Sequence, residues 1–144
     1  MKNQFPIVGI VGAGAMGRGI AQIAAQAGSR VLLLDMQPDA AASARGSIQA
    51  QWLRLQDKGR ISDEQAQGWG NLLESVATIA DLAPCDLVIE AIVERLDAKQ
   101  ALFAQLEAVV GPHAVLATNT SSLAVTAIRA TLRRPERLAG VHVF

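Results

Sequence analysis

The sequence has a single cysteine, Cys85, and few features of exported, membrane or metal-binding proteins. One cysteine cannot form a disulfide within the chain, and it cannot assemble a zinc site alone. We therefore expect no metal site and a reducing, cytoplasmic setting. We interpret Cys85 as a small residue at the edge of the core rather than a reactive thiol.

Long apolar runs and charge imbalance are also missing. Aliphatic stretches such as 31–34 stop at charged residues, far short of the ~20 apolar residues that a membrane span needs. The opening MKNQFP leads into glycines instead of the apolar stretch of a signal peptide. The 13 basic and 13 acidic residues balance, so nothing in the composition favours nucleic acid or an anionic membrane as partner. A small molecule is the expected ligand.

Apolar runs alternate with stretches of helical periodicity along the chain. The 144 residues fit one domain, without internal repeats or a low-complexity linker. The alternation predicts a mainly parallel sheet covered on both faces, with right-handed crossovers. The expected strands are 7–11, 31–34, 76–79, 87–90, 115–117 and 138–144. The expected helices are 15–27, 38–57, 63–73, a helix with apolar positions 98, 102, 106 and 109, and a short capped helix in TSSLAVTAI.

The last expected strand reaches Phe144 without a turn or a polar tail. We expect the chain to be the N-terminal part of a longer protein, the alternative being a natural terminus at the sheet edge.

Three glycines with the spacing Gly-x-Gly-x-x-Gly follow the first apolar run, in VGIVGAGAMGRGIA. Between a strand and a helix, Gly12 allows a tight turn, Gly14 lets the backbone approach a diphosphate, and Gly17 lets the helix pack closely on the sheet. Amide groups at the helix start can hold the diphosphate without a lysine. Together with the alternating pattern, the motif predicts a Rossmann-type, doubly wound α/β domain over residues 1–144. The two consecutive helical stretches at 38–57 and 63–73, separated by the glycine of KGR, predict a helical hairpin after the second strand.

An acidic residue, Asp35, ends the second expected strand, about 20 residues beyond the glycines. Such a carboxylate accepts hydrogen bonds from a ribose 2′-hydroxyl and repels a 2′-phosphate, so the pattern favours NAD over NADP. The alternative is that Asp35 caps a helix and the glycines serve ordinary turns.

Two further stretches, DLVIEAIVERLDAKQALFAQLE and LATNTSSLAVTAI, make the sequence similar to the 3-hydroxyacyl-CoA dehydrogenase family, which includes 3-hydroxybutyryl-CoA dehydrogenases. GAGAMGRGIA and LAGVHVF match the same family, so the resemblance covers the whole chain. It departs at Val143, where the family usually has the first phenylalanine of Phe-Phe-Asn-Pro, an exchange of one apolar residue for another. The resemblance implies NAD-dependent oxidation of a (3S)-3-hydroxyacyl-CoA to a 3-oxoacyl-CoA by hydride transfer.

The resemblance also implies which residues hold NAD. The glycine turn would hold the pyrophosphate and Asp35 the adenine ribose, whereas Glu94 and Lys99 would lie near the nicotinamide ribose. Glu94 and Lys99 could instead be ordinary solvated charges near a helix start. The full implied cofactor set is Gly12, Ala13, Gly14, Ala15, Met16, Gly17, Asp35, Glu94, Lys99, Asn119 and Ser121.

The implied catalytic residues are His142, Ser121 and Asn119. Oxidation of a secondary alcohol must remove the hydroxyl proton while hydride leaves carbon, and an imidazole such as that of a histidine is suited to this work because its unperturbed pKa lies near neutral pH. Ser121 would hydrogen-bond to the reacting oxygen, and Asn119 would orient it. The alternatives are a satisfied core histidine and a serine that caps the short helix, although capping and catalysis do not exclude each other. For the CoA part of the substrate, the resemblance implies contacts to Lys58 and Ser121, and Lys58 could instead be an exposed lysine at a helix end.

The family's remaining parts would lie beyond this chain: a glutamate partner of His142, an asparagine near the substrate, and a helical domain through which the full-length protein forms a homodimer. We therefore expect NAD binding without turnover. AKQALFAQLE resembles bacterial members that act in fatty-acid β-oxidation or phenylacetate catabolism, on 3-hydroxybutyryl- or 3-hydroxyadipyl-CoA. Two alternatives are a non-catalytic NAD-binding protein of the same fold and a dehydrogenase of the 3-hydroxyisobutyrate or phosphogluconate type, for which a catalytic lysine would be expected.

Overall fold

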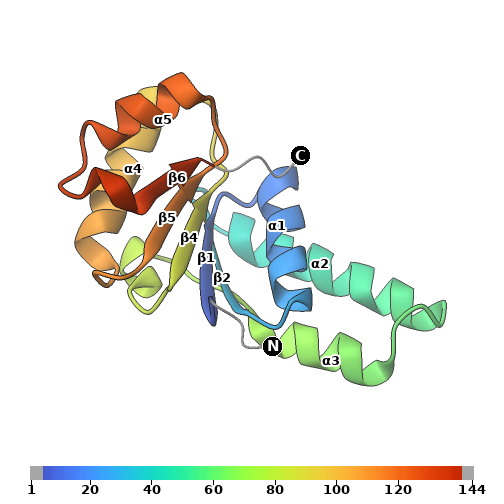
Figure 1. Ribbon diagram of the computed structural model, residues 1–144. Coiled ribbons are helices and arrows are strands. Elements are labelled where there is room, and N and C mark those ends of the chain that lie inside the picture. Colours follow the sequence, from blue (N-terminus) through green and yellow to red (C-terminus); the bar gives the residue numbers. More distant parts are fainter. Residues whose placement is uncertain (1–4, 141–144) are drawn as a thin grey trace.

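The computed structural model describes residues 5–140, which form a parallel sheet flanked by helices on both faces (Figure 1). Within this range the sheet has six strands: β1 (Ile7–Val11), β2 (Arg30–Leu34), β3 (Leu73–Ser75), β4 (Leu87–Glu90), β5 (Val115–Thr118) and β6 (Leu138–Gly140). The α-helices are α1 (Ala15–Gln26), α2 (Ala40–Asp57), α3 (Asp63–Leu72), α4 (Leu96–Val109) and α5 (Ser122–Arg129), with 3₁₀ turns η1 (Ile79–Leu82) and η2 (Pro135–Arg137). The predicted strand beyond 140 lies outside the described residues.

The strand order is β3-β2-β1-β4-β5-β6, and every neighbouring pair is parallel. The chain builds one half of the sheet outward from β1 and then returns to build the other half from β4. The order therefore reverses between β1 and β4, where the crevice at the carboxyl ends of an open parallel sheet binds ligands. This topology confirms the predicted doubly wound, Rossmann-type fold with its helical hairpin after β2.

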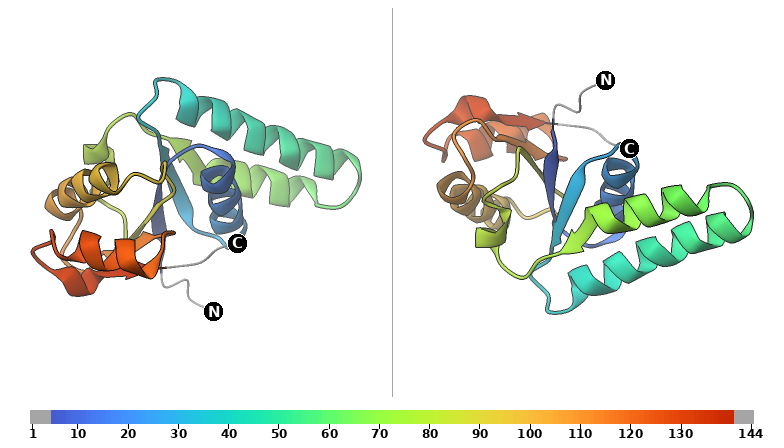
Figure 2. Two further views of the ribbon diagram at one scale, coloured as in Figure 1. Left: turned by 90° about the horizontal axis from the view of Figure 1, so that it is seen from above. Right: turned by 90° about the horizontal axis from the view of Figure 1, so that it is seen from below.

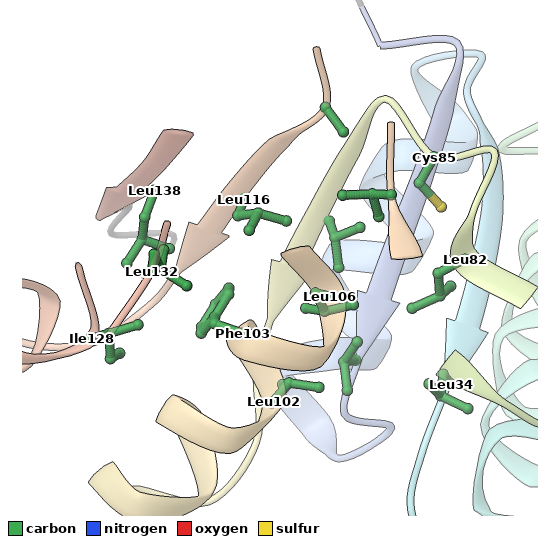
Figure 3. Close-up of a cluster of buried hydrophobic side chains, with 14 of the residues drawn as sticks. Leu34, Leu82, Cys85, Leu102, Phe103, Leu106, Leu116, Ile128, Leu132 and Leu138 are labelled. Carbon is green, nitrogen blue, oxygen red and sulfur yellow. The ribbon is translucent and has the colours of Figure 1, made fainter. Parts of the chain in front are cut away.

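Each face of the sheet has its own apolar core. Figure 2 shows α1, α2 and α3 over one face and α4 and α5 over the other. Strand β2 serves both cores, since Leu33 faces the α1 side and Leu32 faces the α4 side. In the core on the α4 side, Phe103 and Leu106 of α4 lie among side chains from β5, α5 and β6 (Figure 3). Burial on both faces explains why these strands are continuous apolar runs instead of alternating ones.

The predicted strand at 76–79 is wrong. The strand in this part of the chain is β3, which follows α3 without a loop and places the fully buried Leu73 opposite Val31 of β2. Downstream, the Asp81 carboxylate accepts from the amide of Thr78 (3.0 Å), and this bond helps to cap η1. The apolar residues of 76–79 pack against the core from a turn, and their spacing alone does not distinguish a turn from a strand.

The buried faces of two helices also differ from the expectation. For α1 the sequence pattern predicts an inner face of Met16, Ile20, Ala24 and Ala27. The buried residues are instead Gly17, Ile20, Ala21 and Ala25, and Ala27 lies beyond the helix end and is exposed. In α4 a charged residue, Lys99, occupies the inner face together with the apolar side chains. The apolar period of that helix is thus interrupted by a buried cation.

Across residues 5–140 no helix is both long enough and apolar enough to span a membrane. The same residues contain no cluster of three or more His, Cys, Asp or Glu side chains that could hold a metal ion.

Cys85 is 4% exposed, and burial raises the pKa of its thiol to about 12. We expect the folded chain at pH 8 to react with a thiol reagent at least about 100-fold more slowly than the chain in denaturant, because the reactive thiolate is scarce and covered. The measurement is the labelling rate with and without urea. Stoichiometric labelling of the folded chain at the denatured rate would contradict this interpretation.

Candidate functional site

The glycine turn after β1 depends on close backbone contacts. Gly12 has φ +115°, a conformation that glycine adopts without strain, and a Cβ there would overlap the carbonyl oxygen of Ala91. A Cβ on Gly17 would overlap the carbonyl oxygen of Gly12. These two glycines therefore let the turn pack against the segment after β4 and let α1 pack against the turn.

Gly14 differs from both neighbours, because neither packing nor backbone conformation requires glycine there. Its φ is −71°, and a Cβ would meet no atom of the chain within 4 Å. Gly14 is the N-cap of α1, which has no side-chain cap and no acidic residue in its first turn. The first helical bond runs from Arg18 N to Gly14 O (2.9 Å), so the preceding amides have no helical acceptor. The open space at Gly14 thus faces a helix start suited to an anion.

Asp35 follows β2 and binds the backbone of the glycine turn. Its Oδ2 accepts from the Ala13 amide (2.7 Å), and its Oδ1 accepts from the Gln37 amide (2.8 Å). Each carboxylate oxygen can still accept a further hydrogen bond. The carboxylate is therefore fixed in place while it can still bind a hydroxyl.

Asp35 lines two cavities. One, of about 550 Å³, is lined largely by apolar side chains such as Leu34, Ile79 and Val109. The other, of about 470 Å³, lies toward the start of α2, and its described lining includes Asp35 and Asp39 but no lysine or arginine. The second cavity is therefore poorly suited to an additional phosphate.

A network of charged and hydroxyl side chains lies at the carboxyl ends of β4 and β5. Glu90 is 0% exposed and Lys99 1%, and their Oε1 and Nζ atoms are 3.2 Å apart. Lys99 Nζ also lies 2.7 Å from Oε1 of Glu94, whose side chain is 70% exposed. Thr118 donates to Glu90, and Thr120 donates to Oε2 of Glu94 (3.1 Å). The network thus runs from the buried end of β4 to the surface of the crevice.

The hydrogen bond from Lys99 is the largest cause of a lowered pKa at Glu94. The bond from Thr120 acts in the same direction, whereas partial desolvation opposes both. Glu94 therefore carries its negative charge throughout the neutral range, where it can accept hydrogen bonds from a ligand.

Ser121 and Asn119 follow β5 on the same edge of the sheet. Ser121 is the N-cap of α5, and its Oγ accepts from the Ala124 amide (3.3 Å). Ser121 is exposed, so its own hydroxyl proton can be donated to another group. The Asn119 amide donates to the sulfur of Met16, the second residue of α1. This contact joins the two halves of the crevice and brings Asn119 to the start of α1.

One predicted site residue among the described residues, Lys58, is not brought into this group. Lys58 is exposed at the tip of the α2–α3 hairpin, which projects away from α4 and α5 in Figures 1 and 2. His142 lies outside the described residues, so its predicted role stays a prediction.

Sequence reasoning missed Glu90, Thr118 and Thr120. The apolar run LVIE ends on a glutamate inside a predicted buried strand, and this was the available signal. A carboxylate at such a position needs a cationic partner, and Lys99 was the nearest lysine in the sequence.

Comparisons with known proteins agree with this geometry. Residues 7–144 match the model of the family described as "3-hydroxyacyl-CoA dehydrogenase, NAD binding domain". The chain is 44% identical over its full length to 3-hydroxyadipyl-CoA dehydrogenase of Escherichia coli, covering 30% of that protein. It is 40% identical over 93% of its length to a probable 3-hydroxybutyryl-CoA dehydrogenase of Deinococcus radiodurans, covering 48% of that protein. A crystal structure of 3-hydroxybutyryl-CoA dehydrogenase from Escherichia coli superposes with a TM-score of 0.93 at 43% identity, over 99% of this chain and 30% of that one.

The two glycines of the turn are expected to respond differently to alanine. Gly17→Ala should lower the free energy of unfolding by at least about 2 kcal/mol, because the new methyl group meets backbone that cannot move aside. Gly14→Ala should lower it by less than about 1 kcal/mol, because the space is open and only the weaker preference for alanine at an N-cap opposes the change. Urea unfolding of both variants is the measurement, and equal losses would contradict the distinction.

Proposed function

Since the chain belongs to the 3-hydroxyacyl-CoA dehydrogenase family, we propose that it is the NAD-binding part of an enzyme that oxidises the 3-hydroxyl of a (3S)-3-hydroxyacyl-CoA to a 3-oxoacyl-CoA. The chain spans 30–48% of the length of the two curated relatives described above. The observation that carries the proposal is the start of α1, where the amides before Arg18 have no helical acceptor and the exposed N-cap Gly14 leaves open space in front of them.

The residues of the turn fit the parts of NAD. The unpaired amides at the start of α1 would hold the pyrophosphate, and Asp35 would accept from the hydroxyls of the adenine ribose. The apolar cavity of about 550 Å³ beside Asp35 is suited to the adenine ring. The cavity of about 470 Å³ offers two carboxylates, Asp35 and Asp39, and therefore disfavours the 2′-phosphate of NADP.

The nicotinamide half would lie across the crevice, toward β4 and β5. Glu94 would accept from the hydroxyls of the nicotinamide ribose, and Asn119 and Ser121 would border the ring. Lys99 would not contact the cofactor itself but would hold the Glu94 carboxylate through their ion pair. When bound, NAD supplies the acceptor for the hydride that leaves the substrate carbon.

The acid–base chemistry would be performed by side chains at the same edge. The Oγ of Ser121 already accepts from the α5 backbone, so its proton is the group available to the substrate oxygen. His142 would remove the hydroxyl proton, because an imidazole that titrates near neutral pH is suited to general-base work. With Ser121 donating to the substrate hydroxyl oxygen and His142 removing its proton, the two residues together would activate the hydroxyl for oxidation.

The substrate and cellular setting are further parts of the proposal. The relatives described above are named for short acyl-CoA substrates, 3-hydroxybutyryl-CoA and 3-hydroxyadipyl-CoA, and we propose a substrate of this class, as expected for bacterial β-oxidation or phenylacetate catabolism. Lys58, exposed on the α2–α3 hairpin, would contact the CoA part. We also propose a cytoplasmic location and a homodimer formed through a further helical domain.

Cofactor binding is tested with NADH. The wild-type chain should bind NADH, and Asp35→Asn should weaken binding about tenfold, because it loses a charge-assisted acceptor but keeps one oxygen for the loop. The measurement is NADH fluorescence, with NADPH titrated in parallel to test the preference. Asp57→Asn, an exposed change at the end of α2, is the matched control. Well-folded wild-type chain that does not bind NADH would refute the proposed function.

Turnover is tested at His142. With NAD and 3-hydroxybutyryl-CoA the 144-residue chain should form NADH far below the roughly 10 s⁻¹ of a typical enzyme. In a longer protein that contains it, His142→Gln should lower kcat by about 10²- to 10⁴-fold, because a general base is lost. NADH absorbance at saturating substrate is the readout. A kcat that is unchanged in the variant would exclude His142 as the base.

A further inference from the structure

Glu90, at the buried end of the network after β4, has no role in the chemistry described above. We propose that Glu90 is a positioning residue, which acts through Lys99 to hold the Glu94 carboxylate where it binds the nicotinamide half of the cofactor. This inference rests on the proposed function and adds to it a residue that does not itself touch the ligand.

Glu90 is placed at the point where the strand order reverses. It is the last residue of β4, opposite Val11 of β1 and Thr118 of β5. Its carboxylate is 0% exposed and cannot reach a ligand in the crevice. Its Oε2 accepts from the Ile92 amide (2.7 Å), and its Oε1 accepts from Thr118 and faces Lys99. All these neighbours are donors, so the carboxylate is fixed from three directions.

Lys99 transmits this fixed position to the crevice. It lies in the first turns of α4 and is 1% exposed, so its ammonium group is enclosed and relies on two carboxylates. One is the buried Glu90 at 3.2 Å, and the other is Glu94 at 2.7 Å. An ammonium group held on its buried side by a fixed carboxylate has a defined position on its outer side.

Glu94 is the outer end of the chain of contacts. Its side chain is 70% exposed and lies on the loop between β4 and α4, where a free glutamate would adopt many rotamers. Lys99 and Thr120 bind one oxygen each and remove that freedom. A carboxylate fixed before the ligand arrives loses less entropy on binding. The contribution of Glu90 is therefore expected in cofactor affinity.

Glu90 also stabilises the backbone against which the glycine turn packs. The bond from the Ile92 amide to Glu90 fixes the backbone just after Ala91, and the Ala91 carbonyl lies against Gly12. Loss of the Glu90 charge could therefore disturb the pyrophosphate site instead of Glu94. Ligands that use different parts of the crevice separate these two effects.

The test compares NADH with ADP, which has the adenosine and pyrophosphate parts but lacks the nicotinamide ribose. Glu90→Gln should weaken NADH binding about tenfold and change ADP binding less than about twofold. Glu94→Gln should give the same pattern, and the double variant should be no weaker than Glu94→Gln alone, because both changes act on one contact. Calorimetric titration of each chain with each nucleotide is the measurement, and Glu74→Gln, which removes the carboxylate of an exposed ion pair with Arg30, is the matched control.

The outcomes separate the possibilities. Equal weakening of NADH and ADP, unchanged NADH affinity, or additive effects of the two substitutions would each overturn the positioning role. Absence of NADH binding by the wild-type chain would refute the proposed function and this inference together. If Glu90→Gln does not fold, the same titrations are made with Thr118→Val, which removes one hydrogen-bond donor to Glu90 and keeps the side-chain shape. It should weaken NADH binding about threefold without affecting ADP, and an unchanged NADH affinity would overturn the inference.

Discussion

The candidate site is built on a contact between two stretches of backbone at the centre of the sheet. The turn after β1 passes so close to the segment after β4 that Gly12 has no room for a Cβ, and α1 starts so close to the turn that Gly17 has none either. This spacing sets the direction of α1 and aims its first amides at the crevice. The exposed Gly14, Asp35 after β2 and the network after β4 all take their positions around this contact.

Much of the fold could be predicted, because it depends on local patterns that repeat along the chain. Apolar runs with helices between them indicate a doubly wound sheet, and the glycine spacing shows where the chain turns from β1 into α1. The position of β3 could not be predicted in this way. Leu73 belongs to a strand because it pairs with Val31 across the sheet, and that partner is distant in sequence.

Site residues could be predicted where their role follows from residue type and spacing. They could not be predicted where their role depends on which side chains become buried together. The glycines and Asp35 follow from spacing alone. Glu94 and Lys99 were predicted from family resemblance. The glutamate that ends LVIE indicates that a cationic partner is needed, but no sequence pattern predicts that Lys99 is enclosed between two carboxylates. That arrangement arises only when α4 packs on β4. Ser121 shows a further limit, because capping of α5 and donation to a substrate use different parts of one hydroxyl group.

The bond between Asp35 and the Ala13 amide has a consequence for changing the coenzyme preference. The carboxylate that would discriminate between the two coenzymes also anchors the loop that would wrap the diphosphate. Replacing it with a small neutral residue to admit the extra phosphate would free that loop at the same time. A redesign for the phosphorylated coenzyme would therefore need a second substitution that restores an acceptor for this amide, in addition to a cation near the start of α2.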